Sequence, residues 1–283
     1  MPFYPWLNST GEKFIEHGHR LLGMIVGLQA IGLVGITWKK EPRNWVRMFS
    51  VAILIGVILQ GTLGGMRVVF DERTLALIHG CTGPLFFAMC VAMVVFTSRW
   101  WRDTQANSEF QSSSQQMKYF RLAILTTILA YLQLVVGAVV RHSPHLTHQS
   151  ASAMFQAAVY LHILLAFAII VHGLLLLWQA SRCHFPTERC WFLAILIGMQ
   201  IVLGASTWIV KYGLPRWASQ TFGELTVANT ADNAFQAIIV TSHVAVGSLI
   251  LVTALAIALR TARQLSFGVF AVDSAPSRLG AVL

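Results

Sequence analysis

Seven apolar stretches of roughly 20 residues most strongly constrain what this chain can fold into. Inside a bilayer each stretch must be a helix, because every backbone N–H and C=O needs a partner within its own segment. The predicted spans are 15–38, 48–70, 74–97, 119–141, 157–180, 190–210 and 236–259. We therefore expect an all-α membrane protein with seven transmembrane helices.

The composition supports a lipid environment. Charged residues make up only 11% of the chain and apolar residues 56%, which leaves too little charge to cover a soluble fold. The net charge of +9 does not indicate nucleic-acid binding, because the basic residues lie in short loops between the apolar runs. The opening MPFYPWLNSTGEKF is polar and aromatic, so no signal peptide is expected.

Lysine and arginine predict the orientation, since cytoplasmic loops carry an excess of both. One side holds thirteen of them: Lys39, Lys40, Arg43, Arg47, Arg99, Arg102, Lys118, Arg121, Arg182, Arg189, Arg260, Arg263 and Arg278. The other side holds seven: Lys13, Arg20, Arg67, Arg73, Arg141, Lys211 and Arg216. We expect the C-terminus in the cytoplasm and the N-terminus outside.

The spans follow an internal repeat. The three outward-running spans carry the pattern Gln-x-x-x-Gly, as Gln60–Gly64, Gln133–Gly137 and Gln200–Gly204, which permits close helix contact. The inward-running spans each carry a histidine near the outer end. The pattern predicts two pseudosymmetric four-helix halves. The first outward-running helix of the first half is absent here, either lost or cut off by a start codon placed too late.

A Ser/Gln-rich segment divides the chain between the two halves. We predict an N-terminal half-bundle over 1–98, a cytoplasmic linker over 99–118, a C-terminal four-helix bundle over 119–260 and a cytoplasmic tail over 261–283.

Four histidines, His19, His79, His162 and His243, lie about five residues inside the outer edge of their spans, which is roughly 7 Å down the helix. A single such histidine is as easily explained by a hydrogen bond at a helix interface. Four at one depth favour metal or haem ligation. Haem fits better than bare zinc or copper, which need three or four converging ligands; two pairs of histidines give two bis-imidazole sites.

The remaining histidines and the cysteines carry weaker signals. His142, His145 and His148 form an outer-loop H-x-x-H-x-x-H run for which metal binding and plain solvation both stay open. Cys183 and Cys190 fall on the predicted cytoplasmic side, so a disulfide between them is not expected.

Glu16 is the sharpest single feature. It stands three residues before His19, so both lie on one helical face, whereas His162 has Val159 at the same offset. One interpretation is an interface carboxylate paired with Lys13 or Arg20. The other is a carboxylate held over a haem that undergoes chemistry, while the second haem only transfers electrons.

The segment FIEHGHRLLGMIVGL, with its E-x-x-H-R core, closely resembles the haem A synthase family. The Gln-x-x-x-Gly helices and the histidines His79, His162 and His243 fit the same pattern over nearly the whole chain. Many members of that family also have cysteine pairs in outer loops. Here those loops contain none, and no thiol-linked step is expected.

The resemblance implies an eight-helix oxidoreductase that converts the C8 methyl group of haem O to the formyl group of haem A for terminal oxidases. Glu16 would be catalytic, His19 and His79 would bind the substrate haem, and His162 and His243 a permanent haem b. Arg20 would pair with a propionate or remain an interface arginine.

The resemblance also implies partners and a location. The implied partners are the haem O synthase (a farnesyltransferase), assembly factors of the terminal oxidase, membrane lipid and a second copy of the chain. The location is the cytoplasmic membrane, or the mitochondrial inner membrane in a eukaryote. The alternatives are a dihaem b-type cytochrome that passes electrons from quinol, which leaves Glu16 unexplained, and a transporter.

Overall fold

The computed structural model describes residues 12–104, 114–143, 146–147, 150–183, 185–214 and 234–265. Its helices are α1 (Glu12–Lys40), α2 (Asn44–Phe70), α3 (Arg73–Thr97), α4 (Arg99–Asp103), α5 (Ser114–His142), α6 (Ala153–Arg182), α7 (Glu188–Tyr212) and α9 (Ala234–Gln264). Within these ranges the only strands are β1 (Leu146–Thr147) and β2 (Ser150–Ala151), which pair antiparallel. All the long elements are therefore helical.

In the described part of the chain, seven helices are long and apolar enough to cross a membrane, so the predicted all-α membrane fold is confirmed. The helices run past the apolar stretches at most ends: α5 begins at Ser114 and α9 continues to Gln264. Large apolar side chains face outward, among them Leu28, Tyr160 and Val202, which are 70%, 71% and 66% exposed. Exposure of this kind suits a surface covered by lipid.

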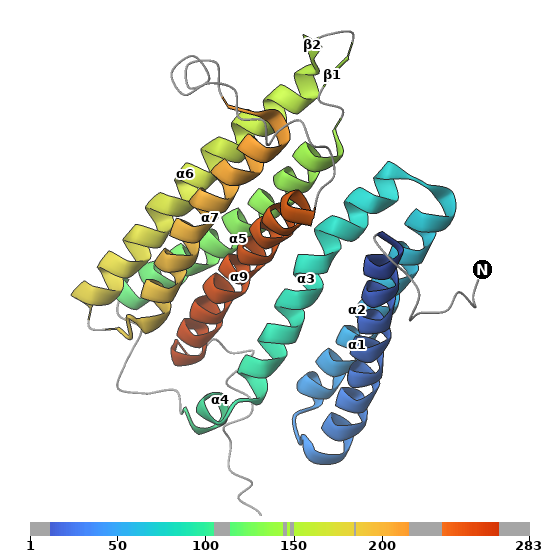
Figure 1. The fold of residues 1–283 in the computed structure, drawn as a ribbon. Helices are drawn as coiled ribbons and strands as arrows, with labels where there is room; N and C mark the ends of the chain where they lie inside the picture. Colours follow the sequence, from blue (N-terminus) through green and yellow to red (C-terminus); the bar gives the residue numbers. More distant parts are fainter. Residues whose placement is uncertain are drawn as a thin grey trace, which may run out of the picture. The chain divides into compact units, whose positions relative to one another are not determined.

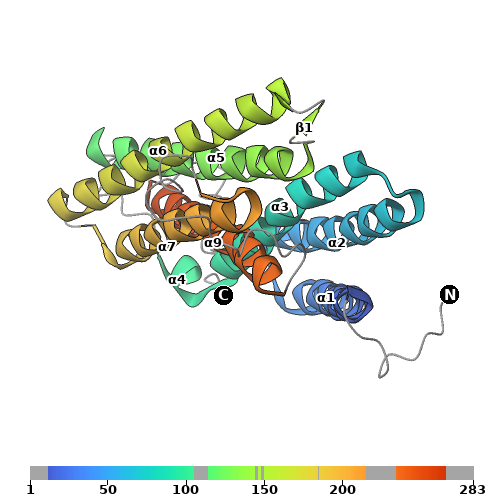
Figure 2. The same cartoon turned by 45° about the horizontal axis from the view of Figure 1, so that its top comes forward.

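The chain divides into two compact units, Met1–Phe96 and Thr97–Leu283. The second unit contains a four-helix bundle in which α5 contacts α6 and α9, and α7 contacts α6 and α9 (Figures 1 and 2). Its centre is filled by fully buried side chains such as Ala123, Leu176, Leu193 and Ala254. Small residues in the centre let the helix backbones approach closely.

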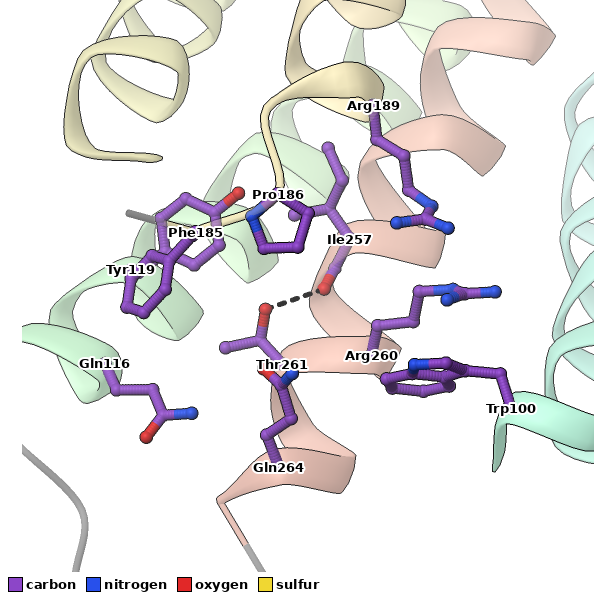
Figure 3. Close-up of a pocket in the computed structure, with 10 residues that line it drawn as sticks. All are labelled: Trp100, Gln116, Tyr119, Phe185, Pro186, Arg189, Ile257, Arg260, Thr261 and Gln264. Atoms are coloured by element: carbon purple, nitrogen blue, oxygen red, sulfur yellow. Dashed lines mark hydrogen bonds between the residues drawn. The ribbon is translucent and has the colours of Figure 1, made fainter. Parts of the chain in front are cut away.

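The short helix α4 is fixed to one end of this bundle. The Ser98 hydroxyl caps α4 by accepting from the N–H of Trp101 at 3.2 Å, and Trp101 is 1% exposed. Arg263, near the end of α9, donates through Nε to the Trp101 carbonyl at 3.1 Å. At the same end, Trp100, Arg189 and other side chains line a cavity (Figure 3).

The first unit is built on α1, α2 and α3. Ala30, Val46, Ile53 and Met93 form its buried core. The hydroxyl of Thr37 on α1 donates to the hydroxyl of Ser50 on α2 at 2.8 Å, which fixes the two helices side by side.

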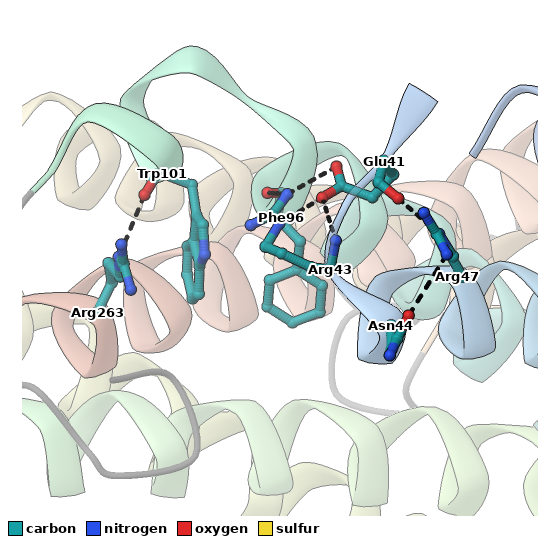
Figure 4. A network of polar contacts seen from close by, with 7 residues as sticks. All are labelled: Glu41, Arg43, Asn44, Arg47, Phe96, Trp101 and Arg263. Carbon is teal, nitrogen blue, oxygen red and sulfur yellow. Dashed lines mark hydrogen bonds and ion pairs between the residues drawn. The ribbon is translucent and has the colours of Figure 1, made fainter. Parts of the chain in front are cut away.

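A polar network closes the end of the first unit at the α1–α2 connection (Figure 4). Arg43 donates to both carboxylate oxygens of Glu41, at 2.6 and 3.0 Å, and to the carbonyl of Phe96 at 3.0 Å. Arg47 donates to the Glu41 carbonyl at 2.6 Å. Arg43 thereby connects the α1–α2 loop to the last turn of α3, where the carbonyls at the helix end attract cations.

Candidate functional site

His19 of α1 and His79 of α3 meet in the first unit. Their ring centroids are 6.3 Å apart and the rings are nearly perpendicular, at 86°. His162 of α6 and His243 of α9 meet in the second unit, also with centroids 6.3 Å apart and with an interplanar angle of 60°. The two pairs expected from the sequence are thus both assembled, each within one unit.

The spacing fits ligation of one metal ion from opposite sides. Each metal–nitrogen bond is about 2 Å and each ring adds roughly 1 Å, so trans imidazole centroids lie roughly 6 Å apart. Aromatic rings in direct contact cover the same range, so further features of the rings decide between the two interpretations. Among the described residues, no three His, Cys, Asp or Glu side chains could hold a bare metal ion.

Three of the four rings rest on a glycine of the facing helix. A Cβ added there would lie 3.0–3.1 Å from Cε1 of the imidazole: Gly64 faces His79, Gly137 faces His162 and Gly204 faces His243. That distance is closer than an alanine tolerates without movement of the ring. The glycine of each Gln-x-x-x-Gly pattern therefore makes room for a histidine.

The same three rings turn their Nδ1–Cε1 edge to the facing helix. Nδ1 is buried in each and makes no hydrogen bond within the described part of the chain. The same is not true of Nε2 in any of the three rings. A Cβ on the facing glycine would lie 3.5 Å from Nδ1 of His79 and of His162, and 3.7 Å from Nδ1 of His243. With Nδ1 turned to the neighbouring helix in all three rings, the arrangement favours ligation through Nε2.

The glutamines pack back against the histidine helices. A Cβ on Gly83 would lie 3.1 Å from Nε2 of Gln60, and a Cβ on Gly247 would lie 3.1 Å from Nε2 of Gln200. These glycines follow His79 and His243 by four residues, as Gly23 follows His19, while His162 is followed by Ala166. Sequence reasoning missed this second contact, although the small residue one turn after every histidine was a visible signal.

Thr82 is a further residue that the sequence did not single out. Its hydroxyl lies 2.9 Å from Oε1 of Gln60 and 2.8 Å from the Ile78 carbonyl, and Gln60 donates to the His79 carbonyl at 3.3 Å. In the second unit, Oε1 of Gln133 and of Gln200 is buried without a hydrogen-bond partner in the described residues. The two units therefore share the contacts between glycine, histidine and glutamine. Among the described residues, however, the glutamine side-chain oxygen accepts a hydrogen bond only in the first unit.

His19 has a more open setting than the other three. Its ring is exposed, and a Cβ on Gly23 would meet nothing within 4 Å. Glu16 accepts a hydrogen bond from Arg20 one turn further along, and both side chains are exposed. The ion pair with Arg20 expected under the simpler interpretation of Glu16 is thus present.

The other histidines lie apart from these pairs. Nδ1 of His142 is 2.8 Å from the Ala138 carbonyl, and Nδ1 of His172 is 2.8 Å from the Ala168 carbonyl. Each therefore bonds within its own helix. His145, His148 and His184 lie outside the described residues, as does the side chain of Lys13. Cys183 is half-buried and Cys190 is buried, and neither forms a disulfide within the described residues.

The sequence matches the family model described as cytochrome oxidase assembly protein over residues 7–218. This chain belongs to the haem A synthase family. Among its relatives, the heme A synthase of Shouchella clausii is 26% identical over 77% of this chain and 75% of the relative. That of Alkalihalophilus pseudofirmus is 28% identical over 65% of each chain. The resemblance inferred from the E-x-x-H-R segment is confirmed. No solved structure matches the chain significantly.

Proposed function

We propose that this chain converts the C8 methyl group of haem O to a formyl group, giving haem A. The proposal rests on the two equally spaced histidine pairs, which differ in the residue one turn before the first histidine of each pair. Glu16 stands one turn before His19, whereas Val159 stands at that place before His162. Chemistry at one site and electron transfer at the other explains this difference.

The second unit would hold a permanent haem b through His162 and His243. Its residues fit such a group by three observations: the 6.3 Å spacing, the buried Nδ1 atoms and the glycines that leave room for the rings. The bound haem would supply one-electron transfer. The protein fixes the two rings from α6 and α9, which the bundle holds together.

The first unit would hold the substrate haem through His19 and His79. His19 is exposed, and the helix face at Gly23 is open. An open ligand on one side suits a haem that must enter as substrate and leave as product. His79 rests on Gly64 and supplies the fixed side of the site.

Glu16 and Arg20 would act together on the substrate. Arg20 holds Glu16 in the structure, and a guanidinium group also binds carboxylates such as a haem propionate. When Arg20 binds the propionate, Glu16 is released toward the ring edge. Glu16 would then accept a proton or stabilise positive charge that develops at the methyl carbon.

The reaction would proceed by two successive two-electron oxidations. The first would add a hydroxyl group from water to the methyl carbon and release two protons and two electrons to an external electron acceptor, giving an alcohol. The second would do the same, giving a geminal diol that loses water to form the aldehyde. The residues named above orient the substrate and handle protons. In the membrane we propose that the N-terminus lies outside and the C-terminus in the cytoplasm, on the thirteen-to-seven distribution of lysine and arginine.

The test is to express Glu16→Ala with haem O supplied, extract the haems and quantify haem A. Loss of a proton-handling group costs about 10²–10⁴-fold in rate, so haem A should fall by at least 10²-fold, by this estimate, while the haem b spectrum stays. Glu188→Ala is the matched control, because Glu188 is an exposed acid in the first turn of α7. Normal haem A production by Glu16→Ala would refute the catalytic role.

The dihaem cytochrome is separated from the synthase by the haem that the protein carries. Purified protein that contains haem O or haem A beside haem b supports the synthase. Protein that contains haem b alone, from cells able to make haem O, supports the cytochrome. Family membership favours the synthase.

A further inference from the structure

A cavity at one end of the C-terminal bundle carries two arginines that the proposed reaction does not use. It has a volume of about 70 Å³, roughly the room of two water molecules in the liquid. Its lining includes Trp100 of α4, Arg189 of α7 and Arg260 of α9. The proposed haem ligand His243 lies 17 residues before Arg260 on α9, or roughly 25 Å along the helix.

The two arginines direct their charge to the same place. Figure 3 shows the guanidinium groups of Arg189 and Arg260 on the same side of α9, and both residues line the cavity. Neither forms an ion pair with a carboxylate in the described part of the chain. No Asp or Glu is among the residues that line the cavity. Two partly buried like charges without a counter-charge attract an anion.

Arg260 is held in position before any ligand binds. Its guanidinium group lies over the Trp100 ring, 4.3 Å from the centroid. Trp100 belongs to α4, which is fixed by the buried Trp101 and its bond from Arg263. A stacked guanidinium group keeps its edge N–H groups available, so little side-chain entropy is lost when an anion binds.

The cavity lies where two helices long and apolar enough to span a membrane end, and in a bilayer such ends lie near the lipid headgroups. Arg189 is the second residue of α7, and Arg260 is in the last turns of α9. Thr187 makes no side-chain cap at the start of α7, so the positive end of the helix dipole adds to the attraction. Basic pockets between transmembrane helices at this depth bind phosphate headgroups.

We propose that this cavity binds the phosphate group of an anionic phospholipid. Arg189 and Arg260 donate charge-assisted hydrogen bonds to the phosphate oxygens. A zwitterionic lipid would bind less well, because its cationic amine finds no carboxylate among the lining residues.

Arg182 offers a matched control within the same unit. It lies over Trp178, 4.8 Å from the ring centroid, and so has the same arginine–tryptophan stacking. Both Arg182 and Trp178 are exposed, and neither lines the cavity. Any general attraction between lipid and a stacked surface arginine would act on Arg182 as well.

The experiment titrates the full-length detergent-purified protein with dioleoylphosphatidylglycerol or dioleoylphosphatidylcholine and counts bound lipid by native mass spectrometry. The unaltered protein should prefer phosphatidylglycerol by roughly thirtyfold, since two arginines at about 1 kcal/mol each give about 2 kcal/mol. The double variant Arg189→Gln/Arg260→Gln should lose this preference, and Arg182→Gln should keep it. Arg260→Lys keeps the charge and should lose only part of it.

Three outcomes would overturn the proposal. The double variant could keep the preference with its helix content and elution volume unchanged. Arg182→Gln could lose as much as the double variant, which would mean a general surface effect. Inorganic phosphate at the same concentration as the lipid could displace it, which would identify a site for a free anion. Circular dichroism and size-exclusion chromatography confirm that each variant is folded before the comparison.

Discussion

Gly204 lies so close to His243 that a Cβ at this position would be 3.1 Å from Cε1 of the imidazole ring. The same relationship joins Gly137 to His162 and Gly64 to His79. A side chain at the glycine would push the ring out of its place. The position of the ring is therefore set by a residue on another helix, and this gives predictions that separate ligand placement from helix stability.

Gly204→Ala should lower the haem b content of the purified protein. The added methyl group overpacks the contact, at a cost of about 1–3 kcal/mol, or moves the ring of His243 away from its partner. Gly198→Ala on the same helix is the control, because a Cβ there meets nothing within 4 Å. The measurement is the low-spin haem absorbance per mole of protein. Equal absorbance in both variants would contradict a positioning role for Gly204.

His162→Ala and His243→Ala should each abolish the low-spin b-type spectrum, because each removes one of the two imidazoles that would hold the haem. His172→Ala should leave it intact. His172 lies on the same helix as His162 but bonds to the Ala168 carbonyl in that helix. The absorption spectrum of the reduced protein measures both effects. A normal spectrum in either ligand variant would remove the pair from the cofactor site.

Gln60→Leu should destabilise the protein more than Gln200→Leu. Gln60 bonds to Thr82 and to the His79 carbonyl, and each lost bond costs about 1 kcal/mol. Oε1 of Gln200 is buried without a partner in the described residues, so its removal relieves a desolvation cost. Thermal unfolding in detergent without added haem compares the two. The reverse order would show that Gln200 has a partner of its own.

Arg43→Leu should lower the thermal stability of the first unit. Arg43 and Glu41 are only 11% exposed at their side chains, and the substitution breaks this largely buried ion pair, at a cost of about 3 kcal/mol. Arg99→Leu is the comparison, because Arg99 is exposed. Differential scanning fluorimetry of both variants measures the effect. Equal shifts of the unfolding temperature in both variants would show that the loss of a positive charge, and not the loss of the Arg43–Glu41 ion pair, destabilises the protein.

The spans and the histidine pairs could be predicted from the sequence. The length of an apolar run and the distance of a histidine from its end can both be read directly along the chain. The ends of the helices could not be predicted in this way: α5 begins at Ser114, where polar residues continue the helix beyond the apolar run that begins near Tyr119. Hydropathy marks where lipid begins, whereas hydrogen bonding decides where a helix ends.

Contacts between helices were harder to predict. The hydrogen bond between Thr82 and Gln60 and the stacking of Arg260 on Trp100 depend on which faces meet after folding. Neither has a fixed spacing along the chain. The role of Gly64 could have been predicted only by comparing two distances along the chain: from Gly64 to the α2–α3 connection, and from that connection to His79.

That connection has a consequence for how the chain tolerates changes in length. Only two residues, Asp71 and Glu72, separate α2 from α3, and Asp71 adopts a left-handed conformation with φ 47°. His79 follows Asp71 by eight residues, and Gly64 precedes it by seven. One residue inserted between Asp71 and His79 would rotate the histidine by about 100° around its helix. The length of this short turn therefore determines where His79 lies relative to Gly64. An inserted residue would misalign the histidine although no residue of the site itself had changed.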